Sequence, residues 1–288
     1  MPSPNRMTIA GAIEACRRRL REVSDTPWLE ARILASHVTG LDASAVVAYG
    51  DSALSTDRCR RLFWLAARRA AGEPVAYLVG YKEFCGLRIA VDRRVLVPRP
   101  ETEDLVMAVV RDWRGRDAEI LELGTGSGAI ACAVAAQLQR ARVLATDVSR
   151  GALAVAERNV EQHAFGERIQ TTHGDLFDAV PNGRTFDVVV ANLPYVGEES
   201  AGHLAAGVRE QEPPAALFGG RDGLDVYRRM LTAVGSYLRQ AGAIYMECSP
   251  FNAAALGAEA RARFADAEIE TRADAAGLPR IVVVKPRA

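Results

Sequence analysis

The chain has 288 residues and carries 36 Lys and Arg against 36 Asp and Glu, so its formal net charge is zero. That length allows two domains, and a content of 49% hydrophobic and 25% charged residues is ordinary for a soluble globular protein. The charge balance argues against an enzyme of duplex DNA, for which a basic footprint is expected. No apolar run approaches the length of about 18 residues that predicts a membrane-spanning helix.

The cysteines and histidines show no pattern of disulfides or metal ligands. The five cysteines are odd in number and form no C-x-x-C pair, which indicates reduced thiols in a cytoplasmic protein. The four histidines have no ligand spacing, so no metal site is predicted. The first residues lack the apolar segment of a signal peptide.

Residues 8–71 are predicted to be helical. Apolar residues recur at helical spacing at Ile9, Ile13 and Cys16, and again from Leu62 onward. Ser55 is suited to cap the last helix of this region. The region is locally basic, which fits either solvated helix faces or the docking of an acidic or ribosome-associated partner. Its clustered arginines are Arg17, Arg18, Arg19, Arg21, Arg58, Arg60, Arg61, Arg68 and Arg69.

A β-hairpin is predicted next, with strands at 84–91 and 95–97 around a turn at 92–94. Beyond it, apolar strand-like runs alternate with helical segments, which predicts a parallel α/β sheet. The last run follows Gly277 and Pro279 with too little chain for a crossover helix, so we expect it to pair antiparallel. The expected strands are 119–123, 143–147, 169–173, 186–191, 242–247, 267–272 and 280–285. The predicted organisation is a helical domain at 1–83, a hairpin linker at 84–97 and an α/β domain at 98–288.

A glycine loop, Gly124-Thr125-Gly126-Ser127-Gly128, joins the strand at 119–123 to a helix of small residues. Glycines at such a strand–helix turn let a ligand approach the backbone closely. The following strand ends in Asp147, about 20 residues further on, where an acidic side chain binds ribose hydroxyls. No Gly-Lys-Ser/Thr follows the loop, which argues against a triphosphate site. The pattern therefore predicts a site for a nucleoside-containing cofactor.

A second segment, Asn192-Leu193-Pro194-Tyr195, is called the clamp below. It follows an apolar run at 186–191 that is typical of a buried parallel strand, and ligands lie beyond the carboxyl ends of such strands. The Asn192 side-chain oxygen and the Leu193 carbonyl can accept the two hydrogens of an NH2 group on a planar carbon. Pro194 restricts Leu193, and Tyr195 offers a flat aromatic face. Taken alone, this segment fits an ordinary turn after a strand as well as it fits a binding site. Taken together with the glycine loop, it predicts methyl transfer from S-adenosylmethionine to an amide or amino nitrogen.

Longer segments resemble the protein-(glutamine-N5) methyltransferases of peptide chain release factors, the PrmC/HemK family of class I S-adenosylmethionine-dependent methyltransferases. The resemblance extends from about residue 10 to the C-terminus, and it implies a doubly wound seven-stranded methyltransferase sheet with an antiparallel last strand. It also implies that the helical domain docks the release factor in translation termination. The segments that carry it are 72–80, 83–87, 95–103 (Val-Leu-Val-Pro-Arg-Pro-Glu-Thr-Glu), 212–220 and 222–225.

The resemblance also assigns roles to residues. The glycine loop would bind the methionine and ribose parts of the cofactor and Asp147 the ribose hydroxyls, while Asp175 and Leu176 would lie near adenine. The clamp would hold the substrate glutamine, with Asn192 and Tyr195 as catalytic residues and Asn192 also near the cofactor. Two segments depart from the family pattern: Leu193 stands where proline is commonest, and 247–252 reads Glu-Cys-Ser-Pro-Phe-Asn in place of Glu-x-Gly-x-x-Gln.

Three alternatives remain open from the sequence. An adenine-N6 methyltransferase of RNA or DNA shares the clamp and the glycine loop, and it predicts nucleic-acid binding that weakens steeply with salt. An NAD-dependent oxidoreductase could use the same loop, but it leaves the clamp without a role. A non-catalytic adaptor would tolerate the loss of Asn192.

Overall fold

The computed structural model describes residues 7–204 and 206–286. These residues form two compact units, one of residues 7–81 with 206–211 and the other of residues 82–204 with 212–286. Within the described ranges, no helix combines the length and the apolar character that crossing a membrane requires.

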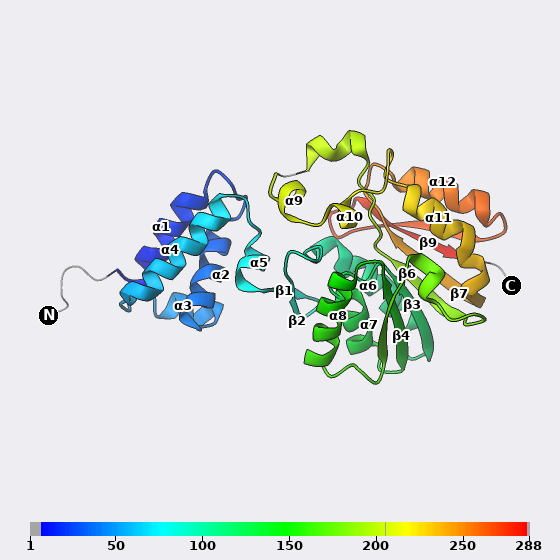
Figure 1. Ribbon diagram of the computed structural model, residues 1–288, viewed down its shortest axis with the longest axis horizontal. Coiled ribbons are helices and arrows are strands. Elements are labelled where there is room, and N and C mark those ends of the chain that lie inside the picture. The colour runs from blue at the N-terminus through cyan, green and yellow to red at the C-terminus, as the bar shows by residue number, and fades with distance from the viewer. Residues whose placement is uncertain (1–6, 205, 287–288) are drawn as a thin grey trace. The chain divides into compact units, whose positions relative to one another are not determined.

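The first unit is helical, as predicted for residues 8–71 (Figure 1). Ile9, Ile13, Cys16 and Leu62 all lie in one buried apolar cluster of this unit, so the helical spacing in the sequence marks its core. Ser55 caps α4 by accepting a hydrogen bond from a backbone N–H of the first turn. The helices are α1 (Ile9–Leu20), α2 (Pro27–Thr39), α3 (Ala43–Ala48), α4 (Thr56–Ala70), α5 (Val75–Val79) and α9 (Ala206–Gln211).

The predicted position of the hairpin is wrong. The hairpin consists of β1 (Tyr81–Phe84) and β2 (Leu87–Ala90), and its turn is at Cys85 and Gly86. These two residues have φ of 47° and 77°, the left-handed conformation that a tight two-residue hairpin turn requires. Residues 92–97 form no strand. Val95 and Val97 are apolar because they are buried, not because they pair in a sheet.

The second strand of the hairpin is held by one buried side chain, Asn159 of α8. Its Oδ1 accepts from the Ala90 N–H at 2.7 Å, and its Nδ2 donates to the carbonyls of Ala90 and Ser127 at 2.9 and 2.8 Å. Asn159 is fully buried, so these bonds satisfy groups that water cannot reach. They also tie the hairpin to the glycine loop.

All seven strands expected in the α/β domain are present, with ends that differ by at most a few residues. They form one sheet in the order β5-β4-β3-β6-β7-β9-β8. The strands from β5 to β7 are parallel, and β9 pairs antiparallel with both β7 and β8, as predicted for the last strand. The strands are β3 (Ala118–Leu123), β4 (Ala141–Asp147), β5 (Ile169–His173), β6 (Phe186–Ala191), β7 (Leu238–Glu247), β8 (Glu268–Ala273) and β9 (Pro279–Lys285).

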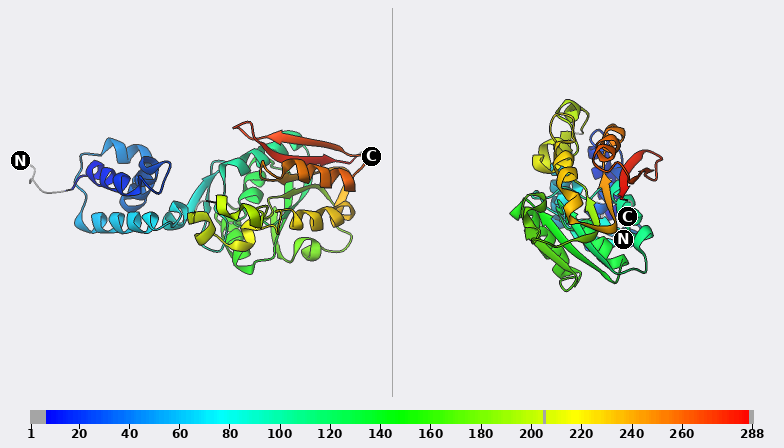
Figure 2. Two further views of the ribbon diagram at one scale, coloured as in Figure 1. Left: turned by 90° about the horizontal axis from the view of Figure 1, so that it is seen from above. Right: turned by 90° about the vertical axis from the view of Figure 1, so that its right-hand side faces the viewer.

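Helices cover both faces of this sheet. α6, α7 and α8 pack against one another on one face, and α11 and α12 pack together on the other (Figure 1). The strands β8 and β9, orange to red in Figure 2, form one edge of the sheet. The helices of this unit are α6 (Pro100–Trp113), α7 (Ala129–Gln137), α8 (Arg150–Gln162), η1 (Leu176–Ala179), η2 (Glu198–His203), α10 (Pro214–Leu217), α11 (Asp225–Ala233), η3 (Val234–Tyr237) and α12 (Ala253–Arg263).

Candidate active site

The pairing register brings four residues together at the carboxyl edge of the sheet. The last paired row across β4, β3, β6 and β7 is Thr146, Leu123, Ala191 and Met246. The residues one position further along these strands are Asp147, Gly124, Asn192 and Glu247. Residues spread over more than 120 positions of the chain thus share one row at the edge where open α/β sheets bind ligands.

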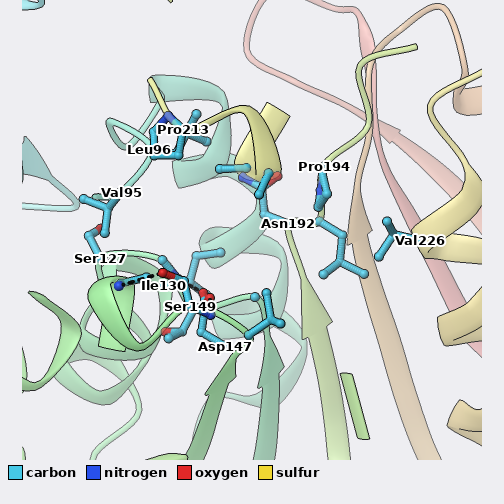
Figure 3. A pocket seen from close by; sticks show the side chains of 18 of the residues that line it. Val95, Leu96, Ser127, Ile130, Asp147, Ser149, Asn192, Pro194, Pro213 and Val226 are labelled. Carbon is cyan, nitrogen blue, oxygen red and sulfur yellow. Dashed lines mark hydrogen bonds between the residues drawn. The ribbon is translucent and has the colours of Figure 1, made fainter. Parts of the chain in front are cut away.

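A cavity of about 330 Å³ opens at this edge. Its lining includes most of the residues predicted to bind cofactor or substrate, and all lining residues belong to the second unit. Figure 3 shows Asp147 and Asn192 around the same space, with Val95, Leu96 and Val226 among its apolar lining. The predicted site residues in the lining are Gly124, Thr125, Gly126, Ser127, Asp147, Asp175, Leu176, Asn192, Leu193 and Pro194.

The glycine loop needs its glycines for two different reasons. Gly124 and Gly126 have φ of 71° and 55° and line the cavity, and a Cβ on Gly124 would lie 3.0 Å from Leu193 Cδ2. Gly128 also has positive φ, 76°, but a Cβ there would lie 3.1 Å from the Cβ of Ala156 in α8. Gly128 is not part of the described lining, and its requirement for glycine comes from its positive φ and from the close packing against α8.

Asp147 is placed by backbone donors. Its Oδ2 accepts from the Gly126 N–H and its Oδ1 from the Ser149 N–H, both at 2.8 Å. Burial raises the pKa of this carboxyl group, while the two backbone bonds act in the opposite direction. Each oxygen keeps a further lone pair, so the carboxylate can accept hydrogen bonds from the hydroxyl groups of a ligand.

The predicted adenine side of the cavity contains a strained residue. Leu176 lines the cavity and has a φ of 50°, a conformation that costs a side chain other than glycine on the order of 1–3 kcal/mol and is common at ligand sites. Its neighbour Asp175 is held by Arg229 of α11 at 2.6 Å. A Cβ on Gly174 would lie 2.7 Å from the Ala179 backbone nitrogen, so this turn also requires glycine.

Thr102 and Tyr227 hold the clamp in place, and neither is among the predicted site residues. The Asn192 Nδ2 donates to Thr102 Oγ1 of α6 at 3.1 Å, and the Leu193 N–H donates to the Tyr227 hydroxyl of α11 at 3.1 Å. Tyr227 is fully buried, and its hydroxyl also donates to the Glu247 carbonyl. One phenol therefore connects the ends of β6 and β7 with the clamp. Thr102 lies in the segment 95–103 on which the family resemblance rests, which is the signal that could have identified it.

Tyr195 does not belong to the described cavity lining. It is half-buried, and its hydroxyl donates to Glu247 Oε1 at 3.1 Å. Glu247 is 1% exposed, and burial raises the pKa of its carboxyl group to about 7, while hydrogen bonds from Thr102 and Tyr195 lower it. The bond to Glu247 therefore anchors the last residue of the clamp to the end of β7, and the flat aromatic face of Tyr195 against the substrate stays a prediction.

A glycine-containing segment, residues 217–223, backs the clamp and is called the backing segment. Val196 and the segment exchange two backbone hydrogen bonds, with Leu217 at 2.9 Å and Gly219 at 3.0 Å. A Cβ on Gly219 would lie 2.2 Å from the Pro194 oxygen, and one on Gly223 would lie 2.1 Å from the Tyr195 oxygen. Only glycine leaves room for the clamp backbone at these two positions.

These features fit S-adenosylmethionine. The cavity volume lies in the range of roughly 300–1,000 Å³ found for small-molecule sites, a buried carboxylate has lone pairs for the ribose, and a glycine backbone permits close approach. The sheet order with antiparallel β9, the glycine loop and the strand-end carboxylate together define a class I S-adenosylmethionine-dependent methyltransferase.

Comparisons with known proteins agree with this class. Residues 11–80 match a family model described as PrmC N-terminal domain, and residues 120–210 match a methyltransferase domain. Release factor glutamine methyltransferases are similar over most of both chains: 42% identical in Bordetella pertussis, covering 88% of this chain and 93% of that protein, and 38% in Geobacter sulfurreducens, covering 97% of each. The chain belongs to the release factor glutamine methyltransferase family, and its cofactor is S-adenosylmethionine.

Solved structures support the fold. A methyltransferase from Pyrococcus furiosus aligns with a TM-score of 0.53 at 17% identity, over 81% of this chain and all of that one. A 16S rRNA N2 G1207 methyltransferase from Thermus thermophilus, solved with AdoMet and guanosine, aligns with a TM-score of 0.51 at 18% identity, over 72% of this chain and 50% of that one.

Proposed function

We propose that this enzyme transfers the methyl group of S-adenosylmethionine to the side-chain nitrogen N5 of the glutamine in the Gly-Gly-Gln loop of peptide chain release factors. The observation that carries the proposal is the orientation of Asn192. Its Nδ2 donates one hydrogen to Thr102 Oγ1 at 3.1 Å, and Oδ1, on the other branch of the amide, can accept a hydrogen bond from a ligand. The residue lies in the cavity, one strand away from the glycine loop.

The clamp suits an amide nitrogen. An NH2 group on a carbonyl carbon is a poor nucleophile because its lone pair is delocalised, so its orientation matters. Asn192 Oδ1 and the Leu193 carbonyl can accept its two hydrogens and fix the plane of the amide. S-adenosylmethionine supplies a methyl group that is already activated on a sulfonium. Holding the amide and the cofactor together in the reactive geometry can then contribute roughly 7–11 kcal/mol to lowering the barrier.

Each part of the cavity has a defined task in this proposal. The glycine loop and Asp147 bind and orient the cofactor, with Asp175 and Leu176 on the adenine side. Pro194 restricts Leu193, whose carbonyl is the backbone acceptor. Thr102 fixes the side-chain amide of Asn192, and Tyr227 fixes the backbone N–H of Leu193. The apolar lining excludes water from the reacting atoms.

The helical unit is proposed to dock the release factor. Trp64 of α4 is 56% exposed, and the Arg68 guanidinium lies 4.5 Å from the centre of its ring. Arg68 also pairs with Glu73 at 2.6 Å, and Arg60, which keeps most of its side chain in solvent, pairs with Asp57 at 3.4 Å. Arg58 of the same helix is exposed as well. An exposed aromatic residue among cations suits an acidic protein surface. A cytoplasmic location belongs to the same proposal, because five free thiols suit a reducing compartment.

The direct test uses the full-length enzyme, purified release factor and isotope-labelled S-adenosylmethionine, with the modified residue mapped by mass spectrometry. One methyl group on the glutamine of the Gly-Gly-Gln loop is expected. RNA and DNA added in parallel reactions distinguish the adenine-N6 alternative. Label in nucleic acid, or on another residue of the release factor, would contradict the proposal.

A further inference from the structure

The face of α8 that packs on the glycine loop carries two closely placed residues. Ala156 lies so near that a Cβ on Gly128 would be 3.1 Å from the Cβ of Ala156. Three residues further along, Asn159 is fully buried and donates from Nδ2 to the Ser127 carbonyl at 2.8 Å. Because residues three apart share a helix face, α8 contacts two successive residues of the loop.

The side-chain amide of Asn159 uses both of its hydrogens and its oxygen. Its Nδ2 donates to the carbonyls of Ala90 and Ser127 at 2.9 and 2.8 Å, and its Oδ1 accepts from the Ala90 N–H at 2.7 Å. A backbone N–H can only donate and a backbone carbonyl can only accept. These partners therefore fix the direction of the amide, and one buried group is bonded to both the hairpin and the glycine loop.

Ser127 provides the backbone donor of the glycine loop that the described residues leave without a partner. It lines the cavity (Figure 3) and is 4% exposed, so an acceptor atom of a bound ligand can complete its hydrogen bonding. The other four N–H groups of the loop are bonded within the protein: those of Gly124 and Thr125 to the Thr146 carbonyl, that of Gly126 to Asp147 and that of Gly128 to the Thr125 carbonyl.

Ser127 is also the loop residue that could turn most easily. It stands between Gly126 and Gly128, whose φ values are 55° and 76°, and glycine lets the neighbouring peptide groups rotate at little steric cost. The bond from Asn159 holds the Ser127 carbonyl and so restricts the conformation of the residue between these glycines.

We propose that Asn159 is a positioning residue of the cofactor site, which holds Ser127 in the conformation that binds S-adenosylmethionine and couples this conformation to the hairpin. This role concerns cofactor binding alone and does not depend on which group receives the methyl.

The hairpin takes part through its bonds to Asn159. The described cavity lining contains no residue of β1 or β2, so a cofactor in the cavity acts on the hairpin through intervening residues, and Asn159 contacts both sides. Coupling of this kind is reciprocal. If the hairpin in its closed state favours cofactor binding, the bound cofactor must disfavour opening of the hairpin by the same factor.

The same helix offers a matched contact without the second connection. Gln162 is exposed, and its Nε2 donates to the Arg88 carbonyl of β2 at 3.1 Å. It bonds the same strand from the same helix, and its partner lies outside the glycine loop. Gln162→Ala is therefore the control for the loss of a contact between α8 and the hairpin.

The test measures the affinity of the full-length enzyme for S-adenosylmethionine by isothermal titration calorimetry. Asn159→Ala should weaken it roughly 10- to 100-fold, because the released Ser127 carbonyl must be returned to a buried position without its donor. Gln162→Ala should stay within about threefold of wild type, as is usual for an exposed substitution.

Tyr245→Phe separates cofactor affinity from general stability. Tyr245 is fully buried and does not line the described cavity, and its hydroxyl accepts from Trp113 and donates to Asp112. Like Asn159→Ala, this variant removes a buried hydrogen-bonding group, so both should lower the Tm. We expect Asn159→Ala to lose cofactor affinity and Tyr245→Phe to keep it.

Hydrogen exchange of the wild-type enzyme gives a second readout, which decides the question should Asn159→Ala fail to fold. S-adenosylmethionine should slow exchange in residues 84–91 by more than about threefold beyond its effect on β8 at the edge of the sheet, as expected for a local opening coupled to binding. Equal slowing of the two segments would overturn the inference. Wild-type affinity in folded Asn159→Ala, or an equal loss of affinity in Tyr245→Phe or Gln162→Ala, would do the same.

Discussion

The cavity has two parts: a cofactor half, formed by the glycine loop and Asp147, and a clamp half, formed by the clamp. They lie at the ends of neighbouring strands but are held in place differently. Asp147 is fixed by backbone donors 2 and 21 positions away in the chain. The clamp is fixed by Thr102, Tyr227 and Glu247, which lie 90, 34 and 52 positions from the clamp residues that they contact. The glycine loop and Asp147 are thus fixed within one βαβ unit, whereas the clamp depends on the packing of α6, α11 and β7 around it.

This difference predicts how variants behave. Substitutions in the cofactor half should change cofactor affinity and leave the clamp intact. Substitutions in the clamp or its supports should lower the rate of methyl transfer and leave cofactor affinity nearly unchanged.

Asn192→Ala should have the largest effect. It removes one of two acceptors and frees the substrate amide to rotate, and the loss of one preorganised polar contact of this kind costs about 10²–10³ in kcat. Single-turnover methylation with saturating cofactor measures it, and Asn182→Ala, at an exposed position, is the control. A rate within about threefold of wild type, far below that 10²–10³ loss, would remove the clamp mechanism.

Gly223→Ala should come next. Its Cβ would lie 2.1 Å from the Tyr195 oxygen, so the clamp backbone must move, and a shift of about 1 Å can cost on the order of 10²-fold in rate. Gly115→Ala is a matched control, because Gly115 has a similar φ of 77° with nothing within 4 Å of its Cβ position. If both variants lose the same activity, the effect is backbone strain and the backing segment has no special role.

Asp147→Ala should weaken cofactor binding by roughly 10- to 100-fold, since hydrogen bonds to a charged group contribute about 1.5–3 kcal/mol. Isothermal titration calorimetry measures the affinity, and circular dichroism checks that the variant is folded. Unchanged affinity in a folded variant would exclude the ribose assignment.

Glu122→Gln should have the smallest effect, on stability. Glu122 is fully buried beside the glycine loop, and burial, with a further contribution from Asp147, raises its pKa to about 8, against the Thr125 hydrogen bond. The folded state therefore keeps a proton that the unfolded state releases above about pH 4.5, and the wild type loses stability as pH rises from there to about 8. A glutamine at this position has no proton to release, so the variant does not lose stability over this pH range.

The Tm advantage of Glu122→Gln should therefore be small at pH 4.5 and reach at least about 2–4 °C at pH 9, the shift that 1 kcal/mol produces in a domain of this size. Glu161→Gln, at an exposed helix position, serves as the control. A Tm difference that does not grow with pH would show that Glu122 is charged in the folded protein.

The same contrast explains what could be predicted from the sequence. The seven strands, the antiparallel last strand and Asp147 follow from local patterns, since apolar runs and turn residues determine them nearby in the chain. The hairpin does not follow from local patterns, because Val95 and Val97 are apolar owing to burial rather than strand pairing, and because the left-handed conformation of Cys85 has no sequence signal.

The supports of the clamp could not be predicted for a different reason. Thr102 and Tyr227 meet the clamp only after α6 and α11 pack on the sheet, and neither belongs to a motif with a known mechanism. Gly219 and Gly223 lie in segments that carry the family resemblance, but their close approach to the clamp oxygens arises only from the folded arrangement.

The central claim is that the two halves do separable work in one reaction, and a double-mutant cycle tests it most directly. The quantity measured is kcat/KM for release-factor methylation in wild type, Asn192→Ala, Asp147→Ala and the double variant. The account predicts that the two losses of transition-state stabilisation add to within about 0.5 kcal/mol, as for independent sites. A coupling energy well above about 1 kcal/mol would contradict it, because residues that act as one unit are strongly non-additive.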